Sequence, residues 1–144
     1  MKRRVPSVVS AMTPFPYAID AGESVDAARA MMREHEIHHL PVLRDGVLDG
    51  VISAQDIDVT YDVLAKQTVA VQLTVGSIYT RDPYVVEVDA RLDEVAEEIA
   101  RRRIDSALIT KHGKLAGILT NTDVCYALVA LLRESAGGPG DDVA

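Results

Sequence analysis

The chain contains two copies of one sequence pattern, and this internal repeat restricts its possible folds more than any other feature. An offset of 67 residues, from Met12 to Tyr79, aligns residues 12–56 with residues 79–123 without a gap. Nine aligned pairs are identical, mainly at glycine, proline and polar positions: Thr13/Thr80, Pro16/Pro83, Tyr17/Tyr84, Asp26/Asp93, Ile37/Ile104, Gly46/Gly113, Leu48/Leu115, Gly50/Gly117 and Asp56/Asp123. Because 144 residues leave room for two very small units, we interpret the chain as a tandem repeat.

Each copy predicts the element order β-α-β-β-α. Ser24 is a suitable cap for a helix whose apolar residues recur at helical spacing, and the second copy repeats this spacing at Leu92, Val95, Ala96 and Ile99. Two short apolar runs then flank a turn in which glycine takes a positive φ, as in a β-hairpin; the turns are Asp45-Gly46 and His112-Gly113. A second helix follows, with apolar residues at positions 57, 61 and 64, and at 124, 128 and 132.

These elements predict a mixed α/β (α+β) protein built from two repeats. We assign residues 5–66 to repeat 1, 67–76 to a linker and 77–133 to repeat 2. Residues 134–144 are expected to form a flexible tail, because glycine, proline and aspartate dominate positions 137–142. The core must be aliphatic, since the chain has no Trp, one Phe and five Tyr.

Composition disfavours two classes of partner. The net charge is −7 and the sequence pI is about 5.0, so polyanions are repelled, and aromatic residues for stacking bases are scarce. The basic run at residues 2–4 is followed by Pro6 rather than by an apolar signal-peptide segment, and no apolar stretch is long enough to span a membrane. We therefore expect a cytoplasmic protein that binds neither nucleic acid nor membrane, with its single cysteine, Cys125, in the core.

The strongest chemical signal lies where the last strand of each copy gives way to its second helix. Residues 50–56 and 117–123 share one pattern: glycine, two apolar residues, a hydroxyl, two variable residues and aspartate. The first turn of a helix has free N–H groups and partial positive charge that suit a phosphate, and a carboxylate suits the 2′,3′-diol of ribose. The alternative is that Ser53/Asp56 and Thr120/Asp123 only cap their helices. Recurrence in both copies, with Asp where a capping box usually has Glu or Gln, favours a ligand site.

The order of these motifs resembles the cystathionine-β-synthase (CBS) domain family. Met12-Thr13-Pro14, the Ile37–Val42 segment and the two motifs ending in aspartate resemble a tandem CBS pair, or Bateman module, over about residues 5–132. The resemblance implies a pseudo-two-fold pair of repeats packed sheet to sheet. It also implies that clefts between the repeats bind a regulatory adenosyl ligand, such as AMP, ADP, ATP or S-adenosylmethionine, with no required cofactor or metal.

The resemblance assigns roles by position. It places Asp56 and Asp123 on ribose, Ser53 and Thr120 on phosphate, and Thr13 and Thr80 near the base. Arg81 joins the predicted ligand-binding set because its side chain can reach a phosphate, and Ala107 in the second copy completes that set.

The adjacent histidines His38 and His39 leave three interpretations open. Similar positions in some family members face phosphates, where a protonated imidazole would supply charge. The other interpretations are a solvated helix end and, together with His35, a zinc site. We include His38 and His39 in the predicted ligand-binding set. The second copy has Asp105 and Ser106 at these positions, so we expect the two sites to be unequal.

The predicted function is regulatory. We expect a protein that binds an adenosyl ligand between its repeats and signals to a separate, unidentified effector protein. No nucleophile–base arrangement or phosphate-loop motif occurs, so an enzyme is not expected. The alternative function is a ligand-free structural or dimerisation module. We also expect a homodimer, because Val129, Leu132 and their neighbours make the last helix apolar on several sides.

Overall fold

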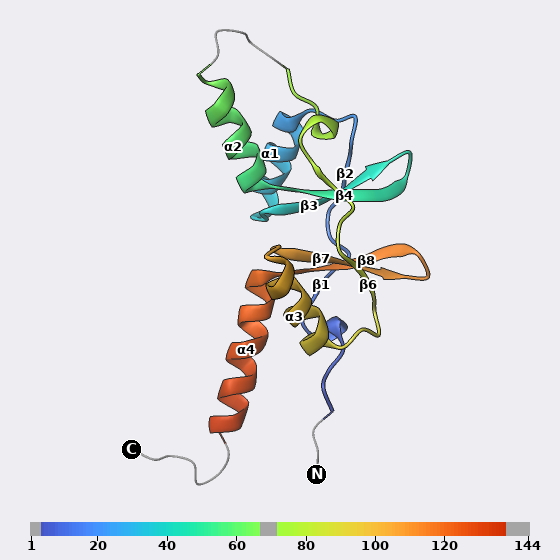
Figure 1. Cartoon of the computed structure of the whole chain (residues 1–144), viewed down its shortest axis with the longest axis vertical. Helices are drawn as coiled ribbons and strands as arrows, with labels where there is room; N and C mark the ends of the chain where they lie inside the picture. The colour runs from blue at the N-terminus through green and yellow to red at the C-terminus, as the bar shows by residue number, and fades with distance from the viewer. Residues whose placement is uncertain (1–3, 67–71, 138–144) are drawn as a thin grey trace. The chain divides into compact units, whose positions relative to one another are not determined.

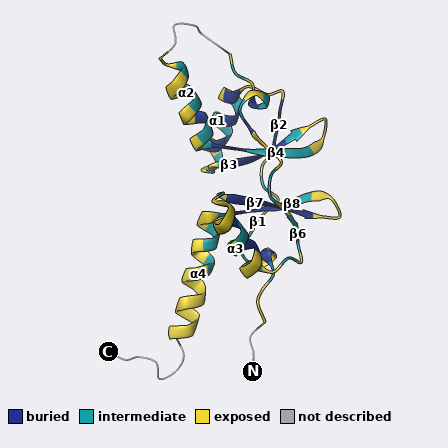
Figure 2. Ribbon diagram, viewed as in Figure 1, coloured by how far each residue is buried: buried dark blue, intermediate teal, exposed yellow. Residues whose placement is uncertain are grey.

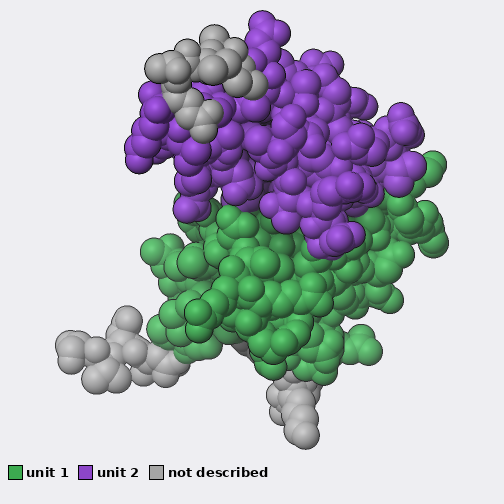
Figure 3. Space-filling model, turned by 45° about the horizontal axis from the view of Figure 1, so that its top comes forward, with its two compact units in different colours: residues 1–15, 84–144 green, residues 16–83 purple. Residues whose placement is uncertain are grey.

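A computed structural model describes residues 4–66 and 72–137 and divides the chain into two compact units. Unit 1 contains the residues up to Phe15 together with those from Tyr84 onward, and unit 2 contains Pro16–Pro83 (Figure 3). The fold is the mixed α/β type that the sequence predicts, with four helices and two small sheets.

Unit 2 is a four-stranded sheet with two helices on one of its faces (Figure 1). Its elements are β2 (Ile19–Asp20), α1 (Val25–His35), β3 (His39–Arg44), β4 (Val47–Ser53), α2 (Ala54–Leu64), a short 3-10 helix η2 (Val75–Ser77) and β5 (Thr80–Arg81). The strand order is β2-β3-β4-β5; β2 runs parallel to β3, and the other pairs are antiparallel. The core lies between the sheet and the helices and includes Val25, Ala28, Leu40, Ile52 and Ile57.

Unit 1 repeats this arrangement. Its elements are a 3-10 helix η1 (Val8–Ser10), β1 (Thr13–Pro14), β6 (Val85–Glu87), α3 (Leu92–Arg102), β7 (Ser106–Lys111), β8 (Lys114–Thr120) and α4 (Asn121–Ala136). The strand order is β1-β8-β7-β6, and α3 and α4 lie on one face (Figure 1). Its smaller buried cluster includes Val8, Val95, Ile99, Ile109 and Leu119.

The two units divide the chain differently from the two sequence repeats. Opening segment 1 (residues 4–15) lies at the start of repeat 1 in the sequence, yet its strand β1 pairs with β8 of repeat 2 in unit 1. Opening segment 2 (residues 72–83) begins in the predicted linker and pairs with β4 of repeat 1 in unit 2. Val75, in that predicted linker, is fully buried in the core of unit 2. Each repeat therefore exchanges its opening segment for that of the other repeat.

Several local predictions are confirmed. The Ser24 hydroxyl accepts a hydrogen bond from the Ala27 N–H at 3.0 Å, so it caps α1. Gly46 and Gly113 have φ of +77° and +76° at the two hairpin turns, a conformation in which a side chain would be strained. The hairpin that each turn closes is antiparallel, as the two apolar runs predict.

The helix α4 departs from the prediction at Cys125 and at its C-terminal end. The helix is 16 residues long. Val124, in its first turn, packs against the core of unit 1, whereas its later turns are exposed (Figure 2). Cys125 is exposed, so its prediction as a core residue is wrong; it lies next to Val124 on the helix and points to another side. α4 also continues past residue 134 to Ala136, and residues 138–144 of the predicted tail lie outside the described residues.

No helix within residues 4–66 and 72–137 is long and apolar enough to cross a membrane.

Candidate functional site

The first turn of α4 in unit 1 holds Thr120 and Asp123 in a reciprocal pair of hydrogen bonds. The Asp123 N–H donates to the Thr120 hydroxyl at 3.3 Å, and the Thr120 N–H donates to Asp123 Oδ2 at 2.9 Å. The Thr120 hydroxyl also donates to Oδ2 at 3.0 Å. The strand β8 delivers Thr120 to the helix start, so the two predicted ligand residues are fixed by secondary structure.

Thr13 reaches the same carboxylate from opening segment 1. Its hydroxyl lies 3.4 Å from Asp123 Oδ1 and 3.5 Å from Oδ2. The contact arises because Thr13 pairs with Ile118 in the β1–β8 ladder, two residues before Thr120. The predicted site residues Thr13, Thr120 and Asp123 therefore lie together in unit 1, although Thr13 and Asp123 are 110 positions apart in the sequence.

Unit 2 forms the corresponding pair at the start of α2. The Asp56 N–H donates to the Ser53 hydroxyl at 3.0 Å, and the Ser53 N–H donates to Asp56 Oδ2 at 3.3 Å. Thr80 pairs with Val51, the register position equivalent to that of Thr13. Within the described residues, however, the Thr80 hydroxyl makes no hydrogen bond to Asp56, so the two carboxylates are held differently.

Both motifs are complete capping boxes. The expectation that Asp in place of Glu or Gln argues against capping is therefore wrong, since the shorter carboxylate reaches the N-cap N–H in both helices. Capping does not use the whole carboxylate, because an ionised aspartate has about four lone-pair positions. Among the described residues, the oxygen Oδ1 of Asp123 accepts only from Thr13, and it keeps capacity for a ligand hydroxyl.

His38 lies just before β3, and His39 is the first residue of that strand. His38 is exposed, and its carbonyl accepts a hydrogen bond from the Ala54 N–H at 2.8 Å, which joins it to the first residue of α2. His39 is half-buried and pairs with Ser53 across β3 and β4. His35, the third histidine of the predicted cluster, stacks on Tyr17 with ring centroids 3.7 Å apart. No group of three metal-ligating side chains comes together in the described parts of the chain.

A pocket of about 450 Å³ lies between the end of α1 and the start of α2 in unit 2. It is lined by Arg29, Met32, Arg33, Glu36, Ile37, His38, Ala54, Ile57 and Asp58. Arg29 forms an ion pair with Asp58 at 3.3 Å, whereas Arg33 has no ion pair among the described residues. Of the predicted site residues, His38 alone contributes to the lining of this pocket, which Arg33 also lines.

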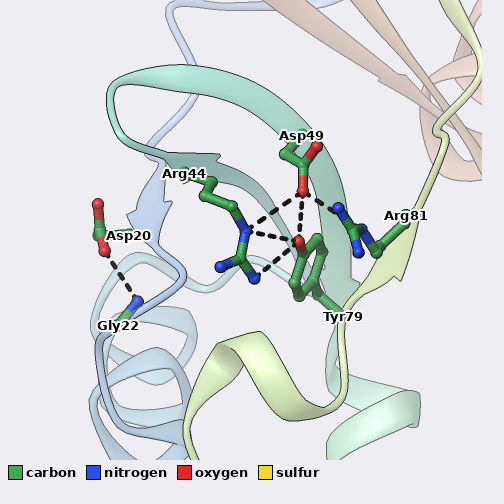
Figure 4. A network of polar contacts seen from close by, with 6 residues as sticks. All are labelled: Asp20, Gly22, Arg44, Asp49, Tyr79 and Arg81. Carbon is green, nitrogen blue, oxygen red and sulfur yellow. Dashed lines mark hydrogen bonds and ion pairs between the residues drawn. The ribbon is translucent and has the colours of Figure 1, made fainter.

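Arg81 belongs to a polar network on unit 2 that sequence reasoning missed (Figure 4). Its guanidinium lies 3.5 Å from Asp49 Oδ2, which also accepts a hydrogen bond from the Tyr79 hydroxyl. Arg44 donates to the same hydroxyl at 3.2 and 3.3 Å. The hydrogen bond from Tyr79, followed by the charges of Arg81 and Arg44, lowers the pKa of the Asp49 carboxyl. The network joins opening segment 2 to the β3–β4 hairpin.

A signal for this network was present in the alignment of the two copies. Asp49 is replaced by Ala116, Arg44 by Lys111 and Tyr79 by Met12, so the polar positions change together between the repeats. The last predicted residue, Ala107, is fully buried in the core of unit 1 and pairs with Leu119 across β7 and β8.

Comparisons with known proteins agree with this architecture. The family model for the CBS domain matches residues 5–58 and 75–130. An inosine-5′-monophosphate dehydrogenase of Korarchaeum cryptofilum is 32% identical over 105 residues, which are 72% of this chain and 20% of that enzyme. The chain thus spans about a fifth of the length of this relative.

Two solved structures show the same fold. The structure of CBSX2 in complex with AMP is 27% identical, with a TM-score of 0.70, and the match covers 88% of this chain and 98% of that one. The CBS domain pair of protein MJ0100, in complex with 5′-methylthioadenosine and S-adenosyl-L-methionine, is 23% identical, with a TM-score of 0.76. That match covers 89% of this chain and 99% of the other, and it supports the fold alone.

Proposed function

The chain belongs to the CBS domain family, and from this premise we propose that it is a regulatory protein that binds an adenosyl ligand. The observation that carries the proposal is the meeting of Thr13, Thr120 and Asp123 at the start of α4. The proposed ligand set is AMP, ADP, ATP and S-adenosylmethionine. A separate effector protein would respond to ligand binding.

The chemistry of the α4 start supports this ligand class. Asp123 Oδ1 accepts a hydroxyl of the ribose diol, while the Thr120 hydroxyl and the partial positive charge of the helix N-terminus favour a phosphate. Asp56 and Ser53 offer the same groups in unit 2, where Arg33 adds positive charge near the start of α2. We therefore propose that the two sites differ in their preference for phosphate.

The relatives support a regulatory rather than a catalytic role. CBSX2, which matches this chain over nearly its whole length, was crystallised with AMP. The enzyme relative named above is matched over only about a fifth of its length, so its dehydrogenase activity does not transfer to this chain. We propose that this chain has no catalytic activity of its own.

A ligand screen tests the proposal. The wild-type protein is expected to be stabilised by at least one of AMP, ADP, ATP and S-adenosylmethionine, because a ligand that binds only the folded state shifts the unfolding equilibrium. At 100 times its Kd such a ligand adds about 2.7 kcal/mol to the free energy of unfolding. Differential scanning fluorimetry followed by titration calorimetry gives the measurement, with adenine base as the control ligand. No shift and no heat with any of the four compounds would contradict the proposal.

A second candidate function is a dimerisation module, and the exposed face of α4 favours it. Leu128, Leu131 and Leu132, which share one side of this helix, are each more than half exposed (Figure 2). Contiguous apolar area of this kind is typical of an interaction surface. The two candidate functions are compatible, since a ligand sensor can also be a dimer.

The homodimer is expected to form through this face of α4. Multi-angle light scattering at tens of micromolar should give a mass of twice 15.6 kDa. Leu132→Glu, which places a charge on the exposed apolar face, should return the mass to that of one chain without loss of helix content. Tyr126→Glu, which places the same charge on the other side of the same helix, is the matched control. A single-chain mass for the wild type would remove the proposal.

A further inference from the structure

The two opening segments are held to their units by different devices. In unit 1, η1 and β1 dock through backbone hydrogen bonds, from Val8 to the Ala90 carbonyl and from Phe15 to the Ala116 carbonyl, each 2.9 Å long. Beyond this backbone pairing, the side chain of Thr13 ties opening segment 1 to Asp123. Opening segment 1 is thus attached directly to the carboxylate of the candidate site.

Opening segment 2 is attached away from its carboxylate. Tyr79 and Arg81 both bind Asp49, on the β3–β4 hairpin, and Arg44 supports the Tyr79 hydroxyl (Figure 4). In the described structure Thr80 makes no hydrogen bond to Asp56. A ligand at Asp56 is therefore next to a segment whose polar side chains, Tyr79 and Arg81, are already bound to Asp49.

We propose that opening segment 1 is the ligand-responsive element of the chain, and that Thr13 couples its docking to occupancy of the Asp123 site. The inference rests on the proposed binding of an adenosyl ligand at Asp123. Opening segment 2 is the static counterpart, because the Asp49 network holds it whether or not a ligand is bound.

The hydrogen-bonding capacity of the two side chains supports this coupling. The Thr13 hydroxyl has one O–H, which it donates to Asp123, and it keeps lone pairs that can accept a second hydrogen bond. Asp123 Oδ2 already accepts two bonds from Thr120, whereas Oδ1 accepts from Thr13 alone within residues 4–66 and 72–137. A vicinal diol carries two O–H donors, and Asp123 Oδ1 with Thr13 Oγ1 supplies two adjacent acceptors.

Such a diol joins α4 to opening segment 1. Binding of the diol then strengthens docking of the segment, and by linkage a docked segment strengthens binding of the diol by the same factor. The close approach of β1 to β8 makes the geometry specific: Gly117 leaves room for Met12, and a side chain there would lie 3.0 Å from the Thr13 carbonyl oxygen.

Hydrogen exchange distinguishes the two segments. The probe is whichever of AMP, ADP, ATP and S-adenosylmethionine binds wild-type protein most tightly by calorimetry. At saturation it should slow exchange of the Val8 and Phe15 amides by roughly 5-fold more than exchange of the Val75 and Gly76 amides. The Val75 and Gly76 amides are comparable reporters, because each donates a 2.8 Å backbone bond that fixes opening segment 2.

Variants of Thr13 test the side chain itself, in an Asp56→Ala background that leaves only the Asp123 site. Thr13→Val keeps the branched shape and removes the hydroxyl, so affinity should fall roughly 5-fold and the extra protection of opening segment 1 should disappear. Thr13→Ser should restore both. Ser10→Ala is the matched control, since that hydroxyl lies in the same segment and donates to the Ser7 carbonyl, away from Asp123.

The outcomes separate this inference from the proposed function. No binding by wild-type protein overturns the proposed function, and this inference with it. Binding that is lost in Asp56→Ala, or equal protection of both segments, overturns the inference and leaves the function intact. Undiminished affinity in Thr13→Val has the same meaning.

Discussion

Gly50→Ala is expected to destabilise unit 2 by about 3 kcal/mol, the upper end of the range for overpacking in a well-packed site. A Cβ at this position would overlap the backbone carbonyl oxygen of Thr80 and lie 2.5 Å from Tyr79 Cδ2. Neither the Thr80 carbonyl nor the Tyr79 ring can move away without breaking other contacts. The Thr80 backbone is paired with β4, and the Tyr79 ring is buried and tied through its hydroxyl to Asp49.

Gly117→Ala is the matched control, because Gly117 occupies the equivalent position of unit 1. There the added Cβ would mainly meet the sulfur end of the Met12 side chain, which is flexible, and would lie 3.0 Å from the Thr13 carbonyl oxygen. We expect a loss of about 1 kcal/mol. Urea unfolding followed by circular dichroism compares the two variants. Equal midpoints for Gly50→Ala and wild type would contradict the close approach of β5 to β4.

The helix caps and hairpin turns can be predicted from the sequence because each is determined by residues that are neighbours in the chain. The Ser24 cap, the glycine turns at Gly46 and Gly113 and the hairpins they close depend on residues within a few positions of one another. The start of each second helix was also placed correctly, since Ser53 and Thr120 mark it by capping. Repetition strengthened these predictions, because each was made twice.

The exchange of opening segments could not be read in the same way. Strands β1 and β5 are two residues long, so their sequence carries no periodicity that identifies a partner. Their pairing depends on contacts with residues far away in the chain, such as Thr13 with Ile118. The sequence therefore predicts Thr13 and Asp123 as separate ligand contacts, and no local pattern in it predicts that they meet.

The exposed part of α4 shows another limit of periodicity. Residues 124, 128 and 132 have helical spacing, and that spacing predicts a helix correctly. It does not predict where the helix leaves the sheet, which depends on the length of the neighbouring elements. Val124 packs against the core, whereas Leu128 and Leu132 are 53% and 59% exposed. The same apolar stripe is therefore buried at its start and exposed further along the helix.

Asp123→Ala is expected to weaken adenosyl-ligand binding at unit 1 by about 10- to 100-fold, equivalent to 1.5–3 kcal/mol for hydrogen bonds to a charged group. The substitution removes the carboxylate that meets Thr13 and Thr120, and with it the acceptor proposed for the ribose diol. It also removes half of the α4 capping box, at a cost of about 1 kcal/mol to folding. A loss of binding in this variant alone would therefore combine two effects.

Asp123→Asn separates the two effects. The amide oxygen can still accept from the Thr120 N–H, so the cap and the fold should survive, but the charge and one acceptor oxygen are gone. Calorimetric titration should show this variant weakened nearly as much as Asp123→Ala, with a melting temperature close to that of the wild type. Cys125→Ser, on the exposed side of the same helix, should bind as the wild type does. Wild-type affinity in Asp123→Asn would mean that the aspartate only caps α4 and that the ligand is held by other groups.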